Sequence, residues 1–174
     1  MNTFLRLLSY IVTRLTAVAI IVILIILAIF IGYDFANINV VVDDGLAKRT
    51  EAILNKEENL DLNKFYTQEY LDRDILLSKN PYEDFIIGDY DQRIKLKKLW
   101  VWPWETNTKV YVEEIVTHIE GSNKDEEQQN TEIPSWESGE KIILMEKDGR
   151  WRISNIILTK PIKPEEKNNN DQEE

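Results

Sequence analysis

The stretch LTAVAIIVILIILAIFIGY, residues 15–33, carries no charged side chain and lies between Arg14 and Asp34. At a rise of about 1.5 Å per residue, a helix of this length spans roughly 30 Å, the thickness of the hydrocarbon core of a bilayer. The rest of the chain is too polar to cross again. We therefore predict one transmembrane helix that carries one domain. A cleaved signal peptide is the alternative, because it also places an apolar run after a basic start.

Charged residues on the two flanks of this helix indicate its orientation. Arg6 and Arg14 precede it, whereas Asp34, Asp43 and Asp44 follow it before the first lysine. Basic flanks are retained in the cytoplasm. We predict a cytoplasmic N-terminal segment at residues 1–14, a transmembrane helix at 15–33, an extracytoplasmic domain at 34–160 and a disordered acidic tail at 161–174.

The composition of the chain excludes several classes of function. Two of its 21 basic residues precede the apolar run, so 19 basic and 31 acidic residues follow it. A field of this sign repels phosphate, and nucleic acid is therefore not an expected partner. The chain has no cysteine, which excludes disulfides, thiol nucleophiles and thiolate metal sites.

Apolar residues recur at helical spacing from the apolar run to residue 80. This pattern predicts two amphipathic helices. The first holds Leu46, Ile53 and Leu54, and the apolar helix could continue straight into it. The second begins near Asp61 and ends before Pro81, because proline disfavours helical geometry in the residue before it.

Beyond Gly88 the pattern predicts strands. Ile94, Leu96, Lys98, Trp100, Trp102 and Trp104 form one alternating set, which indicates a strand with a mostly apolar face. Residues 109–120 predict a second strand with a bulge near Glu113 and Glu114. The sequence of residues 121–138 predicts a long mobile loop. Strands at 140–147 and 150–159 are joined by Asp148-Gly149, a dipeptide typical of a two-residue hairpin turn.

The predicted fold class is α+β: two or three helices packed on a curved antiparallel sheet of about four strands. The segment FYTQEYLDRD, the long strands and the closing hairpin GEKIILMEKDGRWRISNIIL resemble the NTF2-like superfamily, with DGRWRI the most characteristic piece. The resemblance covers roughly residues 42–160 and implies a cone-shaped sheet around the helices. It also implies a role like that of single-pass envelope proteins with an outward NTF2-like domain. These occur in conjugation and secretion channels of the VirB8 and TcpC kind and in sporulation complexes.

Candidate functional residues lie on the predicted strands. Arg93, Lys95 and Lys97 are the basic cluster of an acidic domain, and with Trp100, Trp102 and Trp104 they form the candidate interaction surface. For the tryptophans, packing under the helices is the favoured interpretation. The alternative is an exposed aromatic edge that touches a partner, a bound ligand or the membrane interface. Tyr111 and His118 are pocket candidates, because enzymes of the resembled superfamily use cone-facing His, Asp or Tyr.

The predicted function is a non-enzymatic, membrane-anchored assembly module of a bacterial envelope complex. The sequence has no G-x-S-x-G, no H-E-x-x-H and no phosphate-binding loop, so we expect no catalytic residue, cofactor or metal. Expected partners are the membrane, other envelope proteins and further copies of the chain. The alternatives are a ligand-binding or catalytic cone and a membrane-bound regulator.

Overall fold

The computed structural model describes residues 2–56, 61–124 and 132–162. The fold is α+β, as predicted, with a long N-terminal helix and a four-stranded antiparallel sheet. The helical elements are α1 (Asn2–Leu54), the 3-10 turn η1 (Leu62–Lys64), α2 (Gln68–Arg73) and α3 (Ile75–Ser78). The strands are β1 (Phe85–Leu99), β2 (Asn107–Asn123), β3 (Gly139–Asp148) and β4 (Arg150–Pro161).

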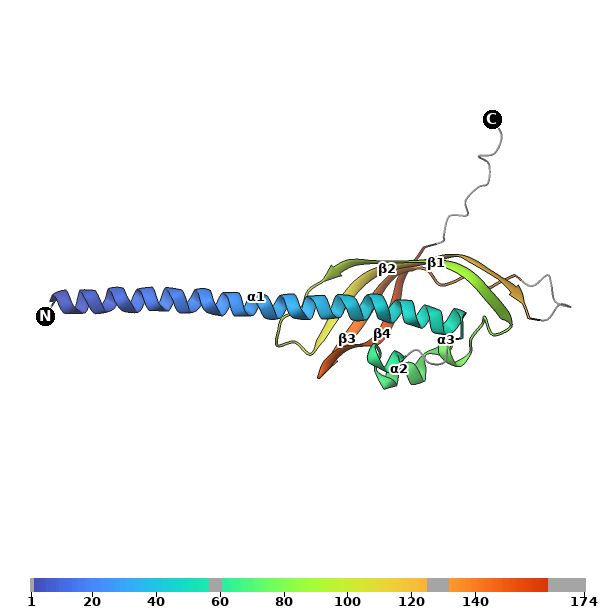
Figure 1. Cartoon of the computed structure of the whole chain (residues 1–174), viewed down its shortest axis with the longest axis horizontal. Helices are drawn as coiled ribbons and strands as arrows, with labels where there is room; N and C mark the ends of the chain where they lie inside the picture. The colour runs from blue at the N-terminus through green and yellow to red at the C-terminus, as the bar shows by residue number, and fades with distance from the viewer. Residues whose placement is uncertain (1, 57–60, 125–131, 163–174) are drawn as a thin grey trace, which may run out of the picture.

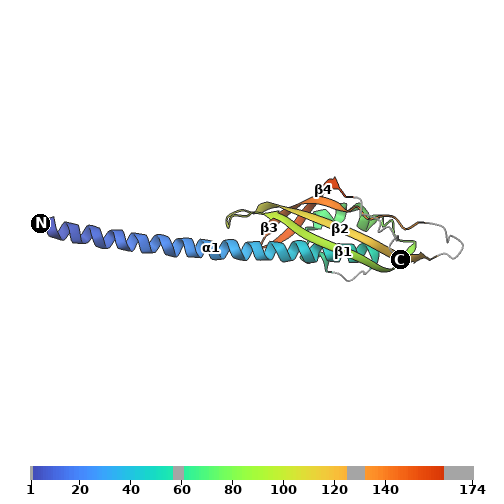
Figure 2. The ribbon, with the colours of Figure 1, turned by 90° about the horizontal axis from the view of Figure 1, so that it is seen from above.

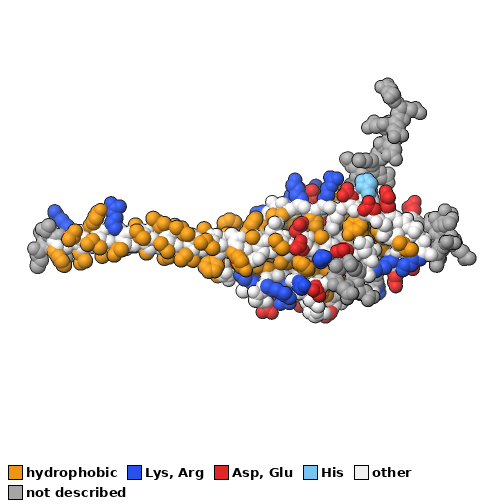
Figure 3. All heavy atoms as spheres, viewed as in Figure 1, with side chains coloured by type: hydrophobic (Ala, Val, Ile, Leu, Met, Phe, Trp, Pro, Cys, Tyr) orange, Lys and Arg blue, Asp and Glu red, His pale blue; other side chains and the backbone are white. Residues whose placement is uncertain are grey.

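Helix α1 is one continuous helix of 53 residues that changes its environment along its length. Its apolar N-terminal part projects from the domain with its side chains exposed (Figures 1 and 3). From Asp34 onward one stripe is buried against the sheet, including Ile38, Val42, Leu46 and Ile53. Within the described residues, α1 is the one helix long and apolar enough to cross a membrane. The apolar run therefore continues without a break into the first helix of the domain, as the sequence suggested.

The strands follow the order β1-β2-β3-β4, with every neighbouring pair antiparallel. The domain part of α1 lies along one face of this sheet, which we call the inner face, and no helix of the described residues lies over the opposite outer face (Figures 1 and 2). The predicted hairpin between β3 and β4 is confirmed, but its turn is not the expected two-residue turn: Asp148 pairs with Arg150, and Gly149 alone, at a positive φ of 69°, lies between them.

Two clusters of buried side chains join α1 to the inner face. The larger cluster includes Ile38, Val42, Val110, Ile143 and Trp151, near the start of the domain part of α1. The smaller cluster lies at the C-terminal end of α1 and contains Ile53, Leu54, Tyr82, Val116 and Trp136. Ile87, near the start of β1, packs with the smaller cluster at the C-terminal end of α1, and Leu99, the last residue of β1, belongs to the larger cluster. Strand β1 therefore runs antiparallel to α1.

The second predicted helix, from Asp61 to residue 80, is broken into three short pieces. The break follows from Asp74, which has an extended backbone (ψ 109°) and ends α2. Its carboxylate accepts a hydrogen bond from the Leu76 amide and so caps α3. The same carboxylate forms an ion pair with Arg49 of α1. A tertiary contact therefore overrides the helical periodicity of this segment.

The prediction that strand β1 continues through Trp104 is wrong, because the strand ends at Leu99. Just before this end the strand contains a bulge: Leu96 pairs with Val112 and Lys98 pairs with Tyr111, so Lys97 is an extra residue in β1. An extra residue turns every later side chain to the opposite face.

The bulge predicted in β2 near Glu113 and Glu114 is absent, since those residues pair regularly with Lys95 and Ile94. The apparent break in alternation arises because Glu114 is a charged residue at an inward position. The predicted loop at 121–138 starts later, since β2 continues to Asn123. Its C-terminal part is not mobile surface, because Trp136 is buried in the smaller cluster. Residues 125–131 of that loop and residues 163–174 of the predicted tail lie outside the described residues.

Candidate functional site

The interior of the domain contains a buried polar network formed by Thr50 of α1, Gln92 of β1, Glu114 of β2 and Lys141 of β3. The Glu114 side chain is fully buried, and its Oε2 lies 2.6 Å from Lys141 Nζ. Glu114 Oε1 accepts hydrogen bonds from Gln92 Nε2 at 2.9 Å and Thr50 Oγ1 at 3.4 Å. Every member of the network has a partner, so it joins α1 to three strands and leaves no free acid or base.

A second buried ion pair lies between α1 and the short helices. Arg49 Nη2 donates to Asp74 Oδ1 at 3.0 Å, and both side chains are more than 90% buried. Tyr66 and Tyr70 stack beside this pair with ring centroids 5.1 Å apart, and Tyr66 donates to the Gly45 carbonyl. Burial raises the pKa of both tyrosines, so their hydroxyls stay protonated at neutral pH. These groups are suited to holding helices together rather than to acid–base chemistry.

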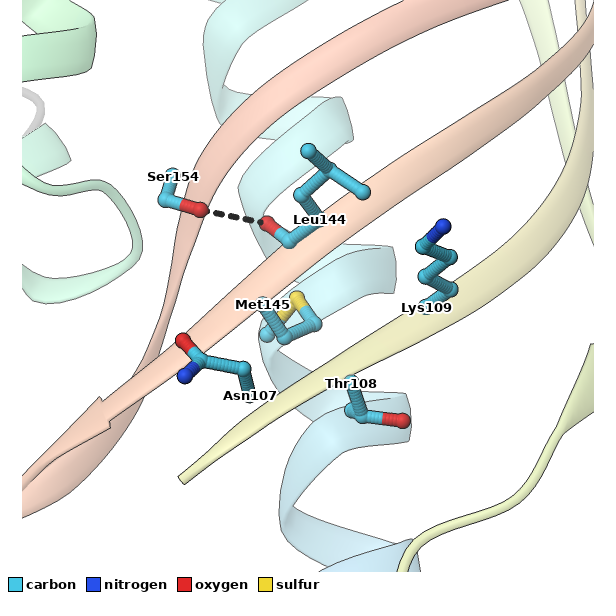
Figure 4. Close-up of a pocket in the computed structure, with 6 residues that line it drawn as sticks. All are labelled: Asn107, Thr108, Lys109, Leu144, Met145 and Ser154. Atoms are coloured by element: carbon cyan, nitrogen blue, oxygen red, sulfur yellow. Dashed lines mark hydrogen bonds between the residues drawn. The ribbon is translucent and has the colours of Figure 1, made fainter. Parts of the chain in front are cut away.

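A hollow of about 260 Å³ lies on the sheet where β2, β3 and β4 adjoin (Figure 4). It is lined by Asn107, Thr108, Lys109, Leu144, Met145 and Ser154. Ser154 Oγ donates to the Leu144 carbonyl at 3.2 Å, which satisfies its hydroxyl. Lys109 is the one ionisable group in this lining. Such a hollow lacks the paired acid and base that a catalytic pocket requires.

The predicted basic cluster lies on the outer face of the edge strand β1. Arg93, Lys95 and Lys97 are exposed, and their inward neighbours Ile94 and Leu96 pack on the core. Acidic side chains neutralise part of this row: Lys97 Nζ lies 2.7 Å from Glu113 Oε2, and Arg93 lies 3.7 Å from Asp91. Basic and acidic side chains accordingly adjoin along this edge of the molecule (Figure 3). The surface is mixed in charge rather than a strong anion-binding patch.

The tryptophans lie in the connection between β1 and β2, residues 100–106, which we call the tryptophan loop. The favoured expectation that all three pack in the core is wrong: Trp100 is 58% exposed, Trp104 is 67% exposed and Trp102 is half-buried. After the bulge at Lys97, Leu99 and Val101 take the inward positions instead.

The three indole rings of the tryptophan loop form one cluster. Trp102 contacts Trp100 edge-to-face at 5.3 Å and stacks on Trp104 at 5.1 Å. The loop backbone is fixed by hydrogen bonds between Trp102 and Glu105 in both directions, at 2.8 and 3.0 Å. Thr108 Oγ1 donates to the Trp100 carbonyl. The loop therefore presents a preformed aromatic surface rather than three independent side chains.

The structure does not bring the two pocket candidates together. Tyr111 lies on the outer face, 40% exposed, with Lys98 Nζ 6.0 Å from its ring centroid. His118 is exposed seven residues further along the same strand, at a positive φ of 51° where β1 and β2 lose register. Its Nδ1 lies 3.1 Å from Thr117 Oγ1. Neither residue lines the hollow of Figure 4.

Sequence reasoning missed the junction between the apolar part of α1 and the sheet. Asp34, the first charged residue after the apolar run, is 3% exposed. Its carboxylate accepts hydrogen bonds from Lys147 Nζ at 2.8 and 3.0 Å and from Trp151 Nε1 at 2.9 Å. The partners are separated from Asp34 by more than 110 residues, so the sequence offered no signal for this contact. The contact fixes the domain at the very end of the apolar segment.

Comparison with known proteins adds no family to this description. No family model matches the chain, and the comparisons with curated proteins and with solved structures find no match either. The functional interpretation therefore depends on the geometry of the domain and on its connection to the apolar helix.

Proposed function

We propose that this chain is a single-pass membrane protein whose extracytoplasmic domain is a non-enzymatic interaction module of a bacterial envelope assembly. The observation that carries this proposal is the dual use of α1. One continuous helix supplies both the apolar segment and the inner layer of the domain. A domain built in this way is held at a fixed height above the membrane, as suits a structural component of an assembly.

The orientation of the domain follows from the charges that flank the apolar segment. Arg6 and Arg14 precede it, and Asp34, Asp43 and Asp44 follow it. The positive-inside rule then assigns the short N-terminal segment to the cytoplasm and the domain to the outside.

The filled interior of the domain argues against a ligand-binding or catalytic cone and in favour of a domain that binds partners on its surface. A ligand-binding cone needs open space between the helices and the sheet. Here that space is filled by α1, by Tyr66 and by the buried polar network, whose acid and base are already paired. The outer face of the sheet is the surface left for partners, and it carries the exposed apolar side chains Tyr111 of β2, next to β1, and Ile157 of the opposite edge strand β4.

We further propose that the domain is NTF2-like. The order of a helix, short helical segments and four antiparallel strands, closed by a tight hairpin, supports this assignment. Conjugation, secretion and sporulation complexes contain anchored domains of this kind, and they are the assemblies in which we would look for partners.

Site-specific photocrosslinking in the native membrane tests this proposal. A photoreactive residue would replace Lys95, Tyr111 or Ile157 on the outer face, and Ile143 in the core would serve as the matched control. We expect discrete adducts with other envelope proteins, or with a second copy of the chain, from the outer positions and none from Ile143. Recovery of uncrosslinked monomer from all three outer positions would refute the assembly role.

A further inference from the structure

The tryptophan loop lies at the end of the domain that faces the apolar segment. Strand β1 runs antiparallel to α1, so the chain that follows Leu99 continues toward the N-terminal part of that helix. Figures 1 and 2 both show the β1–β2 connection reaching back along α1, beyond the other loops of the sheet. Val101, the second residue of the loop, is buried in the same cluster as Ile38, and Ile38 lies one helical turn beyond Asp34.

A chain of hydrogen bonds links the loop to the end of the apolar run. Asp34 binds Lys147 Nζ, and the Lys147 backbone amide donates to the Thr106 carbonyl at 2.7 Å. Thr106 is the last residue of the tryptophan loop. A helix that places Tyr33 at the edge of the hydrocarbon core therefore places the loop beside the same boundary.

The chemistry of the loop suits the lipid head-group region. Tryptophan is enriched at membrane–water interfaces, because its ring is apolar while its N–H can hydrogen-bond. Trp136 and Trp151 are buried, whereas Trp100 and Trp104 in the loop are exposed. The exposed lysines Lys98 and Lys109 flank the loop, and their ammonium groups suit lipid phosphates.

We propose that Trp100, Trp102 and Trp104 insert into the head-group region of the same bilayer that α1 spans. This inference rests on the proposed membrane anchorage and adds a second point of contact to it. A single helix leaves the domain free to rotate about the helix axis. An aromatic loop held in the interface fixes that rotation and so decides which face of the sheet is presented to partners.

Fluorescence quenching of the full chain in phosphatidylcholine vesicles tests the lipid contact. Bromine atoms on the acyl chains quench nearby indoles from within the bilayer, and iodide quenches indoles from water. The wild-type chain is compared with the triple variant Trp100→Phe, Trp102→Phe, Trp104→Phe, which retains Trp136 and Trp151. We expect bromolipid to quench the wild type at least twofold more than the variant, and iodide to quench the loop tryptophans weakly.

Because the chain has no cysteine, a spin label gives a second readout that leaves the tryptophans in place. Asn107→Cys lies next to the loop, and Glu120→Cys is exposed near the other end of the same strand. The label at 107 should collide more with oxygen dissolved in lipid, and the label at 120 more with a water-soluble nickel complex. Equal exposure of both labels to nickel would overturn the proposal.

Flotation of the vesicles separates this inference from the anchorage on which it rests. If the chain does not float with the vesicles, the anchorage fails and the loop contact fails with it. If the chain floats but bromolipid does not quench the loop, only the loop contact fails. If the loop tryptophans were protected from iodide in native membranes but not in vesicles of pure lipid, the lipid contact would also be refuted. The tryptophans would then be assigned to a protein partner.

Discussion

Replacing Lys141 with methionine tests whether the buried polar network is a closed structural element. The Lys141 side chain is 5% exposed and Glu114 is fully buried, and Lys141 is the one cation in hydrogen-bond contact with that carboxylate among the described residues. Lys141→Met leaves a buried charge with only the neutral donors Gln92 and Thr50. Loss of one partner of a buried pair costs about 3–5 kcal/mol, and we expect a loss of unfolding free energy in that range.

The double variant Lys141→Met, Glu114→Met provides the control. It removes both charges while keeping similar side-chain volume, and such replacements are often neutral or stabilising. We therefore expect it to recover most of the lost stability, which gives a favourable coupling energy of roughly 3 kcal/mol between the two sites. The assay is urea unfolding of the full chain in detergent micelles, followed by the fluorescence of the buried Trp136 and Trp151.

A cost below about 1 kcal/mol for Lys141→Met would refute this reasoning, because it would mean that water already reaches the carboxylate. An open, solvated Glu114 would in turn favour the alternative of a ligand-binding or catalytic cone.

Two further predictions concern the packing of the domain. Burial raises the pKa of Tyr82 to about 12 and also raises the pKa of Tyr66 and Tyr70, so the folded state keeps protons that the unfolded state releases near pH 10. Below pH 10 these three groups make their full contribution to the free energy of unfolding. Above pH 10 the free energy of unfolding should fall by up to about 4 kcal/mol per pH unit. The tyrosinate absorbance of Tyr66, Tyr70 and Tyr82 should rise only as the domain unfolds, and ionisation of all three in the folded state near pH 10 would contradict this. Gly139→Ala should destabilise by about 1–3 kcal/mol, because its Cβ would lie 2.2 Å from the Lys160 carbonyl oxygen. Gly88→Ala, with no atom nearer than 3.9 Å, is the matched control, and equal unfolding midpoints for the two variants would count against the β3–β4 register.

Local patterns in the sequence predicted the elements that depend on local physics. The long apolar helix needs only an uninterrupted run of apolar residues, and the β3–β4 hairpin needs only alternation around an Asp-Gly turn. The continuation of the apolar helix into the domain was also foreseeable, because no proline interrupts it.

The candidate surface was harder to predict because it depends on one extra residue. From Asp89 to Leu96 inward and outward residues alternate in β1, and the bulge at Lys97 then exchanges the two faces. The tryptophans consequently lie outside and Val101 lies inside, the reverse of the favoured expectation. A bulge is set by pairing with the neighbouring strand, here at Tyr111 and Val112, and alternation within one strand does not reveal it.

Long-range polar contacts were also beyond the reach of the sequence. Asp34 entered the sequence analysis only as an acidic flank that orients the helix, yet this residue is buried against Lys147 and Trp151 of the distant hairpin. Glu114 was interpreted as a sign of a bulge, yet it occupies an inward position, where Lys141 Nζ lies 2.6 Å from its carboxylate. In both cases a buried carboxylate becomes tolerable only through a partner that the fold supplies.

The most direct test of the proposed function is the side of the membrane on which the domain lies. In the cysteine-free chain, Glu120→Cys places a single thiol at an exposed position of the domain, and Ser9→Cys places one before the apolar segment. A membrane-impermeant maleimide applied to intact protoplasts should label position 120 at once and position 9 only after lysis. Labelling of position 120 only after lysis would place the domain in the cytoplasm and contradict an extracytoplasmic assembly module.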